Sequence, residues 1–302
     1  MKRTFARLLL SGLALAFLLN RVGVAAVADV LASTAVLPLA AGFTLYNAGQ
    51  VASALRWRAL AQAIGFRTGA LHAIRLYFIG MFFGIAIPST LGNNGIRALH
   101  LGREAPGRAR ALSSVVGDRI LGLVTLMGIA ALALALGPRG ELPPWLSIGL
   151  GALSGSMLVG WTLAPRLVGY LPAGNRLRLL VEGDLTPLFR DRKVLLRAVT
   201  TSVAVHALHI LAQKMLTVAL GLDVGLDFIA IYHPLIVLAT AIPITIGGFG
   251  LREATYALLL PYAGVAPDDA VALSLLWWAI GAAGGLLGGI VYVRTPAVRA
   301  AG

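Results

Sequence analysis

The chain has 302 residues, of which 58% are hydrophobic and 12% charged, and its mean hydropathy is +0.86. These values exclude an ordinary soluble domain and indicate a polytopic membrane protein. The net charge of +13 would suggest a nucleic-acid ligand in a soluble protein, but here the basic residues collect in short connections between apolar stretches, so no nucleic-acid partner is expected. Because the chain has no cysteine, disulfides, thiol catalysis and cysteine metal sites are excluded.

Apolar stretches close to the roughly 20 residues that cross a bilayer recur along the whole chain and predict an all-α fold of about eight membrane segments. They cover residues 5–20, 34–55, 70–87, 111–136, 143–163, 194–220, 228–260 and 267–293. The first stretch has a basic start, and residues 26–28 (AVA) resemble a cleavage site, so a signal peptide is one interpretation. An uncleaved first span fits the topology better.

The charges of the connections predict the orientation of the segments. Basic residues place the connections after the second, third and fifth stretches, together with both chain ends, in the cytoplasm of a bacterial inner (plasma) membrane. The connections with Asp223, Asp227, Asp268 and Asp269 are expected on the outer side. The third and seventh stretches must then leave and return on one side, as re-entrant hairpins of two half-helices.

One decapeptide occurs twice. PSTLGNNGIR (Pro88–Arg97) returns 155 residues later as PITIGGFGLR (Pro243–Arg252), with five identities in ten positions. Its proline and glycines supply the break in each hairpin. The single transmembrane domain, 1–302, thus divides into pseudo-repeats of about 1–138 and 139–302 that start on opposite sides, an inverted-topology repeat used by many transporters. The alternative is that proline and glycine only kink two ordinary spans.

Four segments carry a resemblance to a known family. Arg56-Trp57, the motif at 88–97, Asp118-Arg119 and the motif at 243–253 (PITIGGFGLRE) resemble the membrane domain of bacterial lysylphosphatidylglycerol synthases and their standalone flippase-like relatives. The resemblance covers essentially the whole chain, and it implies translocation of a lipid between leaflets. In the full-length synthases this domain moves an aminoacylated phospholipid outward.

Two differences from that family bear on the substrate. The chain lacks the soluble aminoacyl-transferring domain of the synthases, so we do not expect it to synthesise their lipid. Relatives commonly have Gly-Gly-Asp where this chain has Gly92-Asn93-Asn94. The missing acid would otherwise support ion coupling or contact with a cationic headgroup.

The repeated motif has the chemistry of a phosphate site. Glycine-rich turns let backbone amides face an anion, and Arg97 and Arg252 bring planar donor forks that suit phosphate oxygens. The expected binding partner is a membrane phospholipid or another anionic lipid. The residues expected to bind it are Thr90, Gly92, Asn93, Asn94, Gly95, Arg97, Asp118, Arg119, Thr245, Gly247, Gly248, Gly250, Arg252 and Glu253.

Charges within membrane segments need partners or a wet cavity. Asp118 could pair across helices with Arg97 or Arg252. Adjacent residues on a helix do not face one another, so Glu253 need not pair with Arg252. A purely structural ion network, or arginines that anchor in the headgroup layer, is the alternative to ligand binding.

The sixth stretch presents His206, His209 and Gln213 on one helix face, which could form a polar path. Interhelical hydrogen bonding explains this spacing better than a metal, because no acid lies at ligand spacing. His233 is isolated in the sequence. Trp57 suits an interface anchor, and the glycines of the last stretch predict close helix packing.

No HExxH, Gly-x-Ser-x-Gly or Walker motif is present, so we expect neither an enzyme nor ATP-driven transport, and no cofactor or metal. The leading hypothesis is a lipid translocase for a phosphate-bearing headgroup. The alternatives are a transporter of a small anionic or polar solute and a non-transporting scaffold for a lipid-modifying or glycosyl-transferring enzyme. An enzyme partner and a homodimer both stay open.

Overall fold

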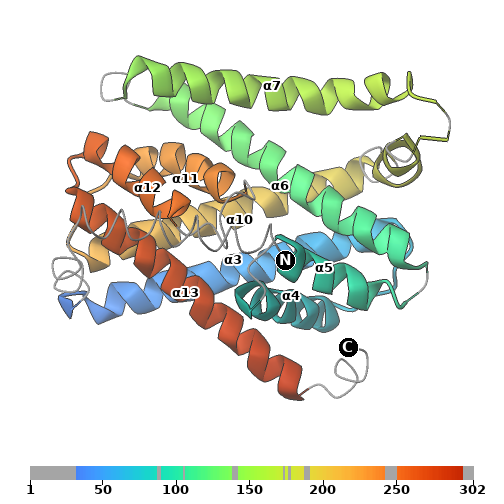
Figure 1. Cartoon of the computed structure of the whole chain (residues 1–302), viewed down its shortest axis with the longest axis horizontal. Coiled ribbons are helices and arrows are strands. Elements are labelled where there is room, and N and C mark those ends of the chain that lie inside the picture. The colour runs from blue at the N-terminus through green and yellow to red at the C-terminus, as the bar shows by residue number, and fades with distance from the viewer. Residues whose placement is uncertain are drawn as a thin grey trace, which may run out of the picture.

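The computed structural model describes residues 32–86, 90–104, 106–137, 142–172, 174–175, 178–186, 191–241 and 250–294, and these residues form a helical bundle without strands (Figure 1). In chain order the elements are α3 (Val36–Ala63), α4 (Ala70–Ala86), α5 (Thr90–Leu101), α6 (Arg108–Leu136), α7 (Pro144–Val168), η1 (Leu179–Leu185), α10 (Arg192–Ala219), α11 (Leu226–Ala241), α12 (Leu251–Leu259), η2 (Leu260–Ala263) and α13 (Pro267–Arg294).

Four of the described helices are long and apolar enough to cross a membrane, namely α6, Pro144–Ala164 of α7, α10 and α13. Helices α4 and α11 are apolar but have only 17 and 16 residues, which at 1.5 Å per residue is about 25 Å, less than the ~30 Å of a hydrocarbon core. The chain is therefore an all-α, multi-pass membrane protein. The total of eight segments stays a prediction, since 5–20 lies outside the described residues.

Helices α3 and α10 lie antiparallel at the centre of the bundle (Figure 1). The amide of Ala35, just before α3, donates to the carbonyl of Ala219 at the end of α10 at 2.8 Å. Near the other end of the pair, Arg56 of α3 donates to Ser202 of α10 at 2.9 Å. The chain consequently leaves α3 for α4 at one end of the bundle and leaves α10 for α11 at the opposite end.

Helices α4 and α5 form an antiparallel hairpin. His72 near the start of α4 lies 3.1 Å from Glu104, just after α5. Closer to the tip, α4 presents Gly80, and a Cβ added there would lie 2.7 Å from Oδ1 of Asn93 on α5. Glycine is thus required for the close approach of the two helices. The connection at 87–89 lies outside the described residues.

A second hairpin, formed by α11 and α12, belongs to the opposite end of the bundle. Its two helices pack through Tyr232 and Tyr256, whose ring centroids are 5.8 Å apart. Gly250 precedes α12 with φ +81°, a conformation that favours glycine. The expected site residues Thr245, Gly247 and Gly248 fall in 242–249, outside the described residues.

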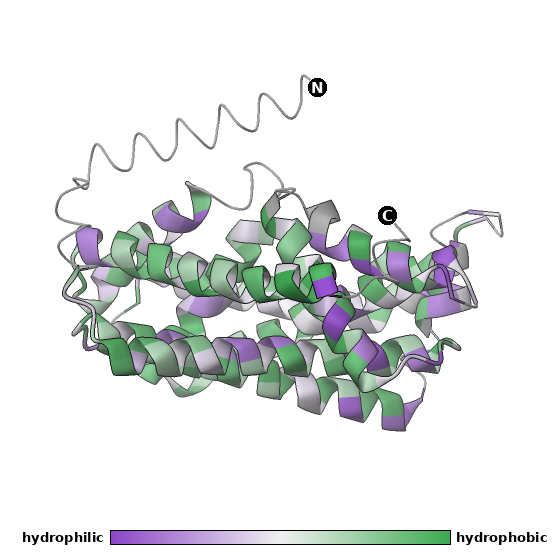
Figure 2. Ribbon diagram, turned by 90° about the horizontal axis from the view of Figure 1, so that it is seen from below, coloured by the Kyte–Doolittle hydropathy of each residue, from purple (hydrophilic) through white to green (hydrophobic). Residues whose placement is uncertain are grey.

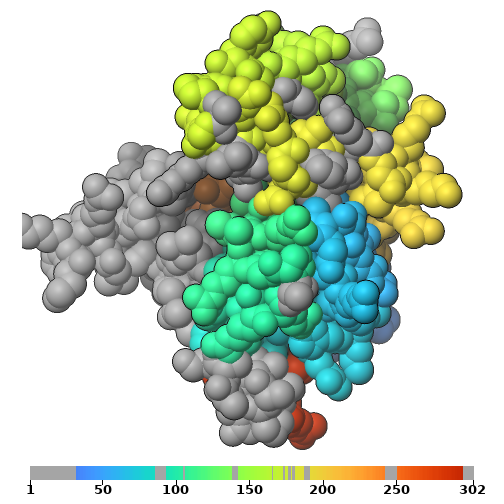
Figure 3. Space-filling view, turned by 90° about the vertical axis from the view of Figure 1, so that its right-hand side faces the viewer, coloured from blue at the N-terminus to red at the C-terminus, as the bar shows by residue number. Residues whose placement is uncertain are grey.

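Figure 3 shows the end of the bundle where α3 is followed by α4, α5 is followed by α6, and α10 begins. Exposed basic residues are numerous in these segments. They are Arg67, Arg75, Arg103, Arg108, Arg110, Arg166, Arg192, Lys193 and Arg197. The opposite end carries exposed Asp223 and Asp227. Apolar residues predominate along the helices between the two ends (Figure 2), so the described part has a hydrophobic band with one basic end.

The glycines of α13 pack against α4, as the sequence predicts. A Cβ added at Gly288 would lie 1.9 Å from the carbonyl oxygen of Phe78, and one added at Gly285 would lie 2.4 Å from Cδ1 of Ile85. The backbone oxygen cannot move out of the way as a flexible side chain can. Helix α13 therefore depends on Gly288 for its position beside α4.

We predict that Gly288→Ala destabilises the protein by about 1–3 kcal/mol, the usual cost of overpacking a close-packed interior. The matched control is Gly155→Ala on α7, where an added Cβ meets nothing within 4 Å. The measurement is the free energy of unfolding in mixed micelles. Equal stabilities of the two variants would contradict the close packing of α13 on α4.

Candidate functional site: a cationic cavity at the first hairpin

A buried ion triad lies at the base of the site. Oδ1 of Asp118 on α6 accepts from Nε of Arg56 on α3 at 2.8 Å, and Oδ2 accepts from Nη2 of Arg97 on α5 at 3.0 Å. The three residues are 2–7% exposed. Arg56 also donates to Ser202 of α10, so this one carboxylate connects, through its arginines, four helices. Such charge-assisted bonds are strong where water is scarce.

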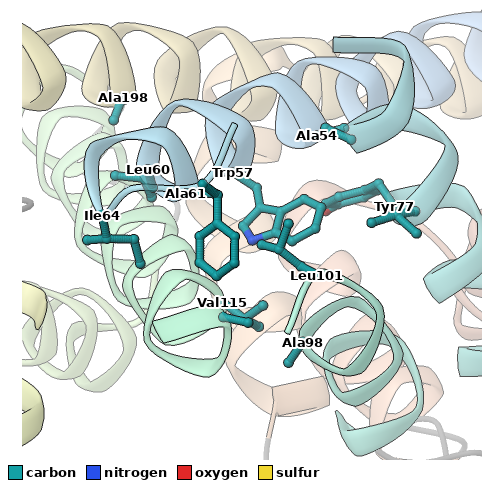
Figure 4. Close-up of a cluster of buried hydrophobic side chains, with 14 of the residues drawn as sticks. Ala54, Trp57, Leu60, Ala61, Ile64, Tyr77, Ala98, Leu101, Val115 and Ala198 are labelled. Atoms are coloured by element: carbon teal, nitrogen blue, oxygen red, sulfur yellow. The ribbon is translucent and has the colours of Figure 1, made fainter. Parts of the chain in front are cut away.

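The guanidinium of Arg97 lies between two aromatic rings. Its Cζ is 4.3 Å from the ring centroid of Trp57 and 4.5 Å from that of Tyr77, and Figure 4 shows these two side chains converging from α3 and α4. The indole of Trp57 is fully buried and donates to Ser114 at 3.1 Å. The prediction of Trp57 as an interface anchor is therefore wrong, because its ring stabilises a buried cation instead.

The three residues of the triad also line a cavity of about 220 Å³. Side chains of six helices line it: Gln50, Ser53, Arg56, Tyr77, Asn93, Asn94, Arg97, Asp118, Arg119, Gly122, Leu123, Leu126, Val205, His206, His209, His233, Val237 and Ala241. Three arginines and one aspartate give this lining a formal charge of +2 when the histidines are neutral. An anion is the ligand that such a cavity favours.

Three imidazoles belong to the part of the lining that α10 and α11 contribute. Nε2 of His206 lies 3.0 Å from the carbonyl oxygen of Gly122. Nδ1 of His233 lies 2.6 Å from Nε2 of Gln213, and the ring of His209 stacks on Tyr46 with centroids 5.3 Å apart. His233, isolated in the sequence, is thus brought 6.0 Å from His206 and 6.2 Å from His209, measured between ring centroids.

These contacts show interhelical hydrogen bonding of the histidines. Within the described part of the chain, no three His, Asp or Glu side chains are grouped so that they could hold a metal ion. Gln213, predicted to belong to a polar path, lies behind His233 and also accepts from Tyr256 at 3.5 Å. It orients the imidazole and is not part of the cavity lining.

The second copy of the motif is arranged differently. Arg252 pairs with Glu253 beside it, and its Nε donates to Ser274 of α13 at 3.1 Å. Glu253 turns back at the start of α12 to accept the Gly250 amide at 2.7 Å. This cap brings its carboxylate to the guanidinium, which is why two adjacent residues meet. None of these residues is in the described lining of the central cavity.

The structure therefore brings together one part of the predicted site. Asn93, Asn94, Arg97, Asp118, Arg119, His206 and His209 line one cavity. Thr90, Gly92 and Gly95 lie on α5 beside it. Arg252 and Glu253 form a separate buried pair. Pairing of Asp118 with Arg97 rather than Arg252 resolves the alternative that the sequence left open.

Sequence reasoning missed Arg56, Tyr77 and His233. The sequence indicates Arg56 as a basic residue that marks the cytoplasmic side and as part of the family resemblance, but not as the partner of Asp118; in the structure it is 7% exposed and bonded to that carboxylate. Its neighbour Arg58 shows the difference, because its Nε donates to the carbonyl of Thr68 in the connection after α3. A polar run, Asn47, Gln50, Ser53 and Arg56 at helical spacing, was the available signal.

Comparison with known proteins identifies the family of the chain. The model of the family "Lysylphosphatidylglycerol synthase TM region" matches residues 4–289, so the chain belongs to that family. It is 23% identical to a UPF0104 membrane protein of Methanothermobacter thermautotrophicus, over 76% of this chain and 78% of that protein. It is 24% identical to glycosyltransferase AglD of Haloferax volcanii over 94% of this chain, but spans only 53% of that relative's length.

We predict that Asp118→Asn destabilises the protein by about 3–5 kcal/mol, because it leaves two buried arginines without a counter-charge. The readout is the free energy of unfolding in mixed micelles. Asp223→Asn is the matched control, because that carboxylate is fully exposed and its contact with Lys214 is long, at 3.9 Å. Exposed ion pairs contribute little, so this variant should leave the stability unchanged. A loss at Asp118 no larger than that of the control would show that the triad is not structural.

Proposed function

We propose that the chain moves a lipid with a phosphate-bearing headgroup between the two leaflets of the membrane, without a chemical step. The observation that carries the proposal is the cavity among apolar helices, whose described lining has a formal charge of +2 and includes the buried Arg97 and the exposed Arg119. Cations in such surroundings are costly without an anionic partner. A phosphate held by the forks of Arg97 and Arg119 would supply that partner, while the acyl chains stay in the bilayer.

The arrangement of the hairpins supports transport. Hairpin α4–α5 and hairpin α11–α12 start from opposite ends of the antiparallel pair α3 and α10, and each half ends in a long helix, α6 or α13. Placed across a bilayer, the hairpins would be re-entrant and would form an inverted repeat around the cavity. Alternating access commonly uses this architecture.

The basic end defines the proposed orientation. Positive connections favour the cytoplasmic side, so the end with Arg103 and Arg108 would face the cytoplasm and the end with Asp223 would face outward. The first hairpin and the central cavity are then entered from the cytoplasmic half. The membrane would be the plasma membrane, with both chain ends in the cytoplasm.

A second candidate is a membrane scaffold for a glycosyl-transferring enzyme. It is favoured by one relative, the Haloferax protein named a glycosyltransferase, in which the matching region is about half of the chain. As a scaffold, the chain would not need the charge of Arg97 for anything but stability. Transport measurements therefore separate the two candidates.

We predict that the purified protein in liposomes accelerates the exchange of a fluorescent phosphatidylglycerol between leaflets, and that Arg97→Gln lowers this rate at least tenfold. The variant removes the charge between Trp57 and Tyr77 but leaves Asp118 bonded to Arg56, so the fold should persist. Dithionite quenching of the outer leaflet measures the rate. The matched control is Arg75→Gln on the exposed side of α4.

Full activity in a folded Arg97→Gln variant would contradict a headgroup site at this arginine. No acceleration by the wild-type protein, with phosphatidylglycerol or with a glycosyl-phosphate lipid, would favour the scaffold.

We predict the membrane topology from the residues that precede and follow each of the two hairpins. Single cysteines at Arg67 and Arg103 should react with an impermeant maleimide only in inverted vesicles, and those at Asp223 and Ala266 only in intact cells. All four positions are exposed, and the native chain has no cysteine. Labelling of Arg67 and Arg103 positions from different sides would mean that α4 and α5 cross the membrane.

A further inference from the structure

Several buried polar atoms of residues around the central cavity have no hydrogen-bond partner in the part of the chain that the structure describes. They are Oδ1 of Asn93, Oδ1 of Asn94, Nε of Arg97, Nδ1 of His206, Nε2 of His209 and Nε2 of His233. Buried polar groups in folded proteins are nearly always paired. The residues that carry these six atoms all line one cavity. They therefore indicate a ligand with many hydrogen-bonding groups, and Arg97, His206 and His233 are each more than nine-tenths buried.

The cavity has a cationic end and an uncharged end, and Gly122 of α6 joins them. A Cβ added at Gly122 would lie 3.2 Å from Nη2 of Arg56, at the cationic end. The carbonyl oxygen of the same residue lies 3.0 Å from His206, at the uncharged end. A single ligand can therefore contact both ends at once.

The cationic end has no carboxylate to offer a second cation. Asp118 is the single acid among the described residues of the lining, and each of its oxygens already accepts from an arginine. An ammonium group in the ligand would meet a lining of charge +2 without a free anion, which is unfavourable in a weakly polar medium. Headgroups that carry an amine are thus disfavoured.

The uncharged polar residues of the lining present both donors and acceptors. A neutral imidazole has one donor and one acceptor nitrogen, and the amides of Asn93, Asn94 and Gln50 have both kinds of group. Hydroxyl groups, which donate and accept, match such a mixture better than a second phosphate would. Tyr46 and Trp277 pack against the imidazole of His209, with ring centroids 5.3 and 5.9 Å away, and hold it toward this end.

From these features we infer that the transported headgroup joins its phosphate to an uncharged, hydroxyl-rich group, glycerol or a sugar, and that ammonium-bearing headgroups are excluded. The inference rests on the proposed function and names the substrate class of the same site. A volume of about 220 Å³ equals roughly seven water molecules at about 30 Å³ each. It accommodates a headgroup and leaves the lipid chains outside.

Isothermal titration of the full-length protein in one detergent tests this with four short-chain probes. Dioctanoyl phosphatidylglycerol and decyl glucosyl phosphate carry the phosphate with a polyol. Dioctanoyl phosphatidylmethanol has the same phosphodiester charge without hydroxyls, and dioctanoyl lysylphosphatidylglycerol adds ammonium groups. We expect one or both polyol probes to bind at least tenfold more tightly than the other two, and the tighter of the pair identifies the glycerol or the sugar as the source.

Two variants assign the preference to its residues. His209→Phe keeps a ring to stack on Tyr46 but removes the unpaired Nε2, so the polyol advantage over phosphatidylmethanol should shrink severalfold. Asn94→Asp adds a carboxylate to the lining and should raise the affinity for lysylphosphatidylglycerol at least tenfold. Asn175→Asp, in an exposed connection after α7, is the control for the added charge and should change neither affinity.

Equal binding of phosphatidylmethanol and both polyol probes would overturn the inference, and so would tighter binding of lysylphosphatidylglycerol. If Arg97→Gln still abolished lipid exchange in either case, the proposed function would survive without the polyol specificity. If none of the four probes bound and the wild-type protein exchanged no lipid, the inference and the proposed function would fail together.

Discussion

The buried carboxylate of Asp118 is the constraint on which the centre of this protein depends. It lies in a bundle whose surroundings are apolar, and it binds Arg56 and Arg97 at 2.8 and 3.0 Å. In such a medium neither arginine is stable without it, and removal of one partner from a buried pair costs more than the pair itself contributes. Helices α3, α5 and α6 are therefore held in one relative position, and the cavity walls follow from that position.

The two copies of the repeated motif have the same residue types, but their arginines have different partners. In the second copy, the adjacent Glu253 neutralises Arg252, and Ser274 of α13 accepts a hydrogen bond from the Nε of this arginine. In the first copy, one carboxylate is shared by two arginines and a third, Arg119, has none. Among the described residues, the first site keeps an excess of positive charge while Arg252 and Glu253 neutralise each other, so the two sites differ in electrostatics.

This charge balance bears on the ligand class that we propose. The Gly92-Asn93-Asn94 segment lies where relatives commonly have an acid, and the structure places both asparagines in the wall of the cationic cavity. An acid at that place would lower the charge of the lining and offer an ammonium a partner. Its absence, together with the three imidazoles of the lining, favours anionic and hydroxylated groups in the site that we propose.

The sequence by itself determined the class of the protein, its family and the repeated motif, and it predicted Arg97 and Asp118 as candidate site residues. Hydropathy and the positions of glycine and proline are local signals, so they can be interpreted without knowledge of the packing. Only the tertiary structure decided which charges meet. Arg56 and Arg58 are two residues apart and look equivalent in the sequence, yet the helix turns one toward Asp118 and the other toward the Thr68 carbonyl. His233 reached the cavity only because α11 packs beside α10, and pairing across helices of this kind depends on three-dimensional proximity that no local pattern encodes.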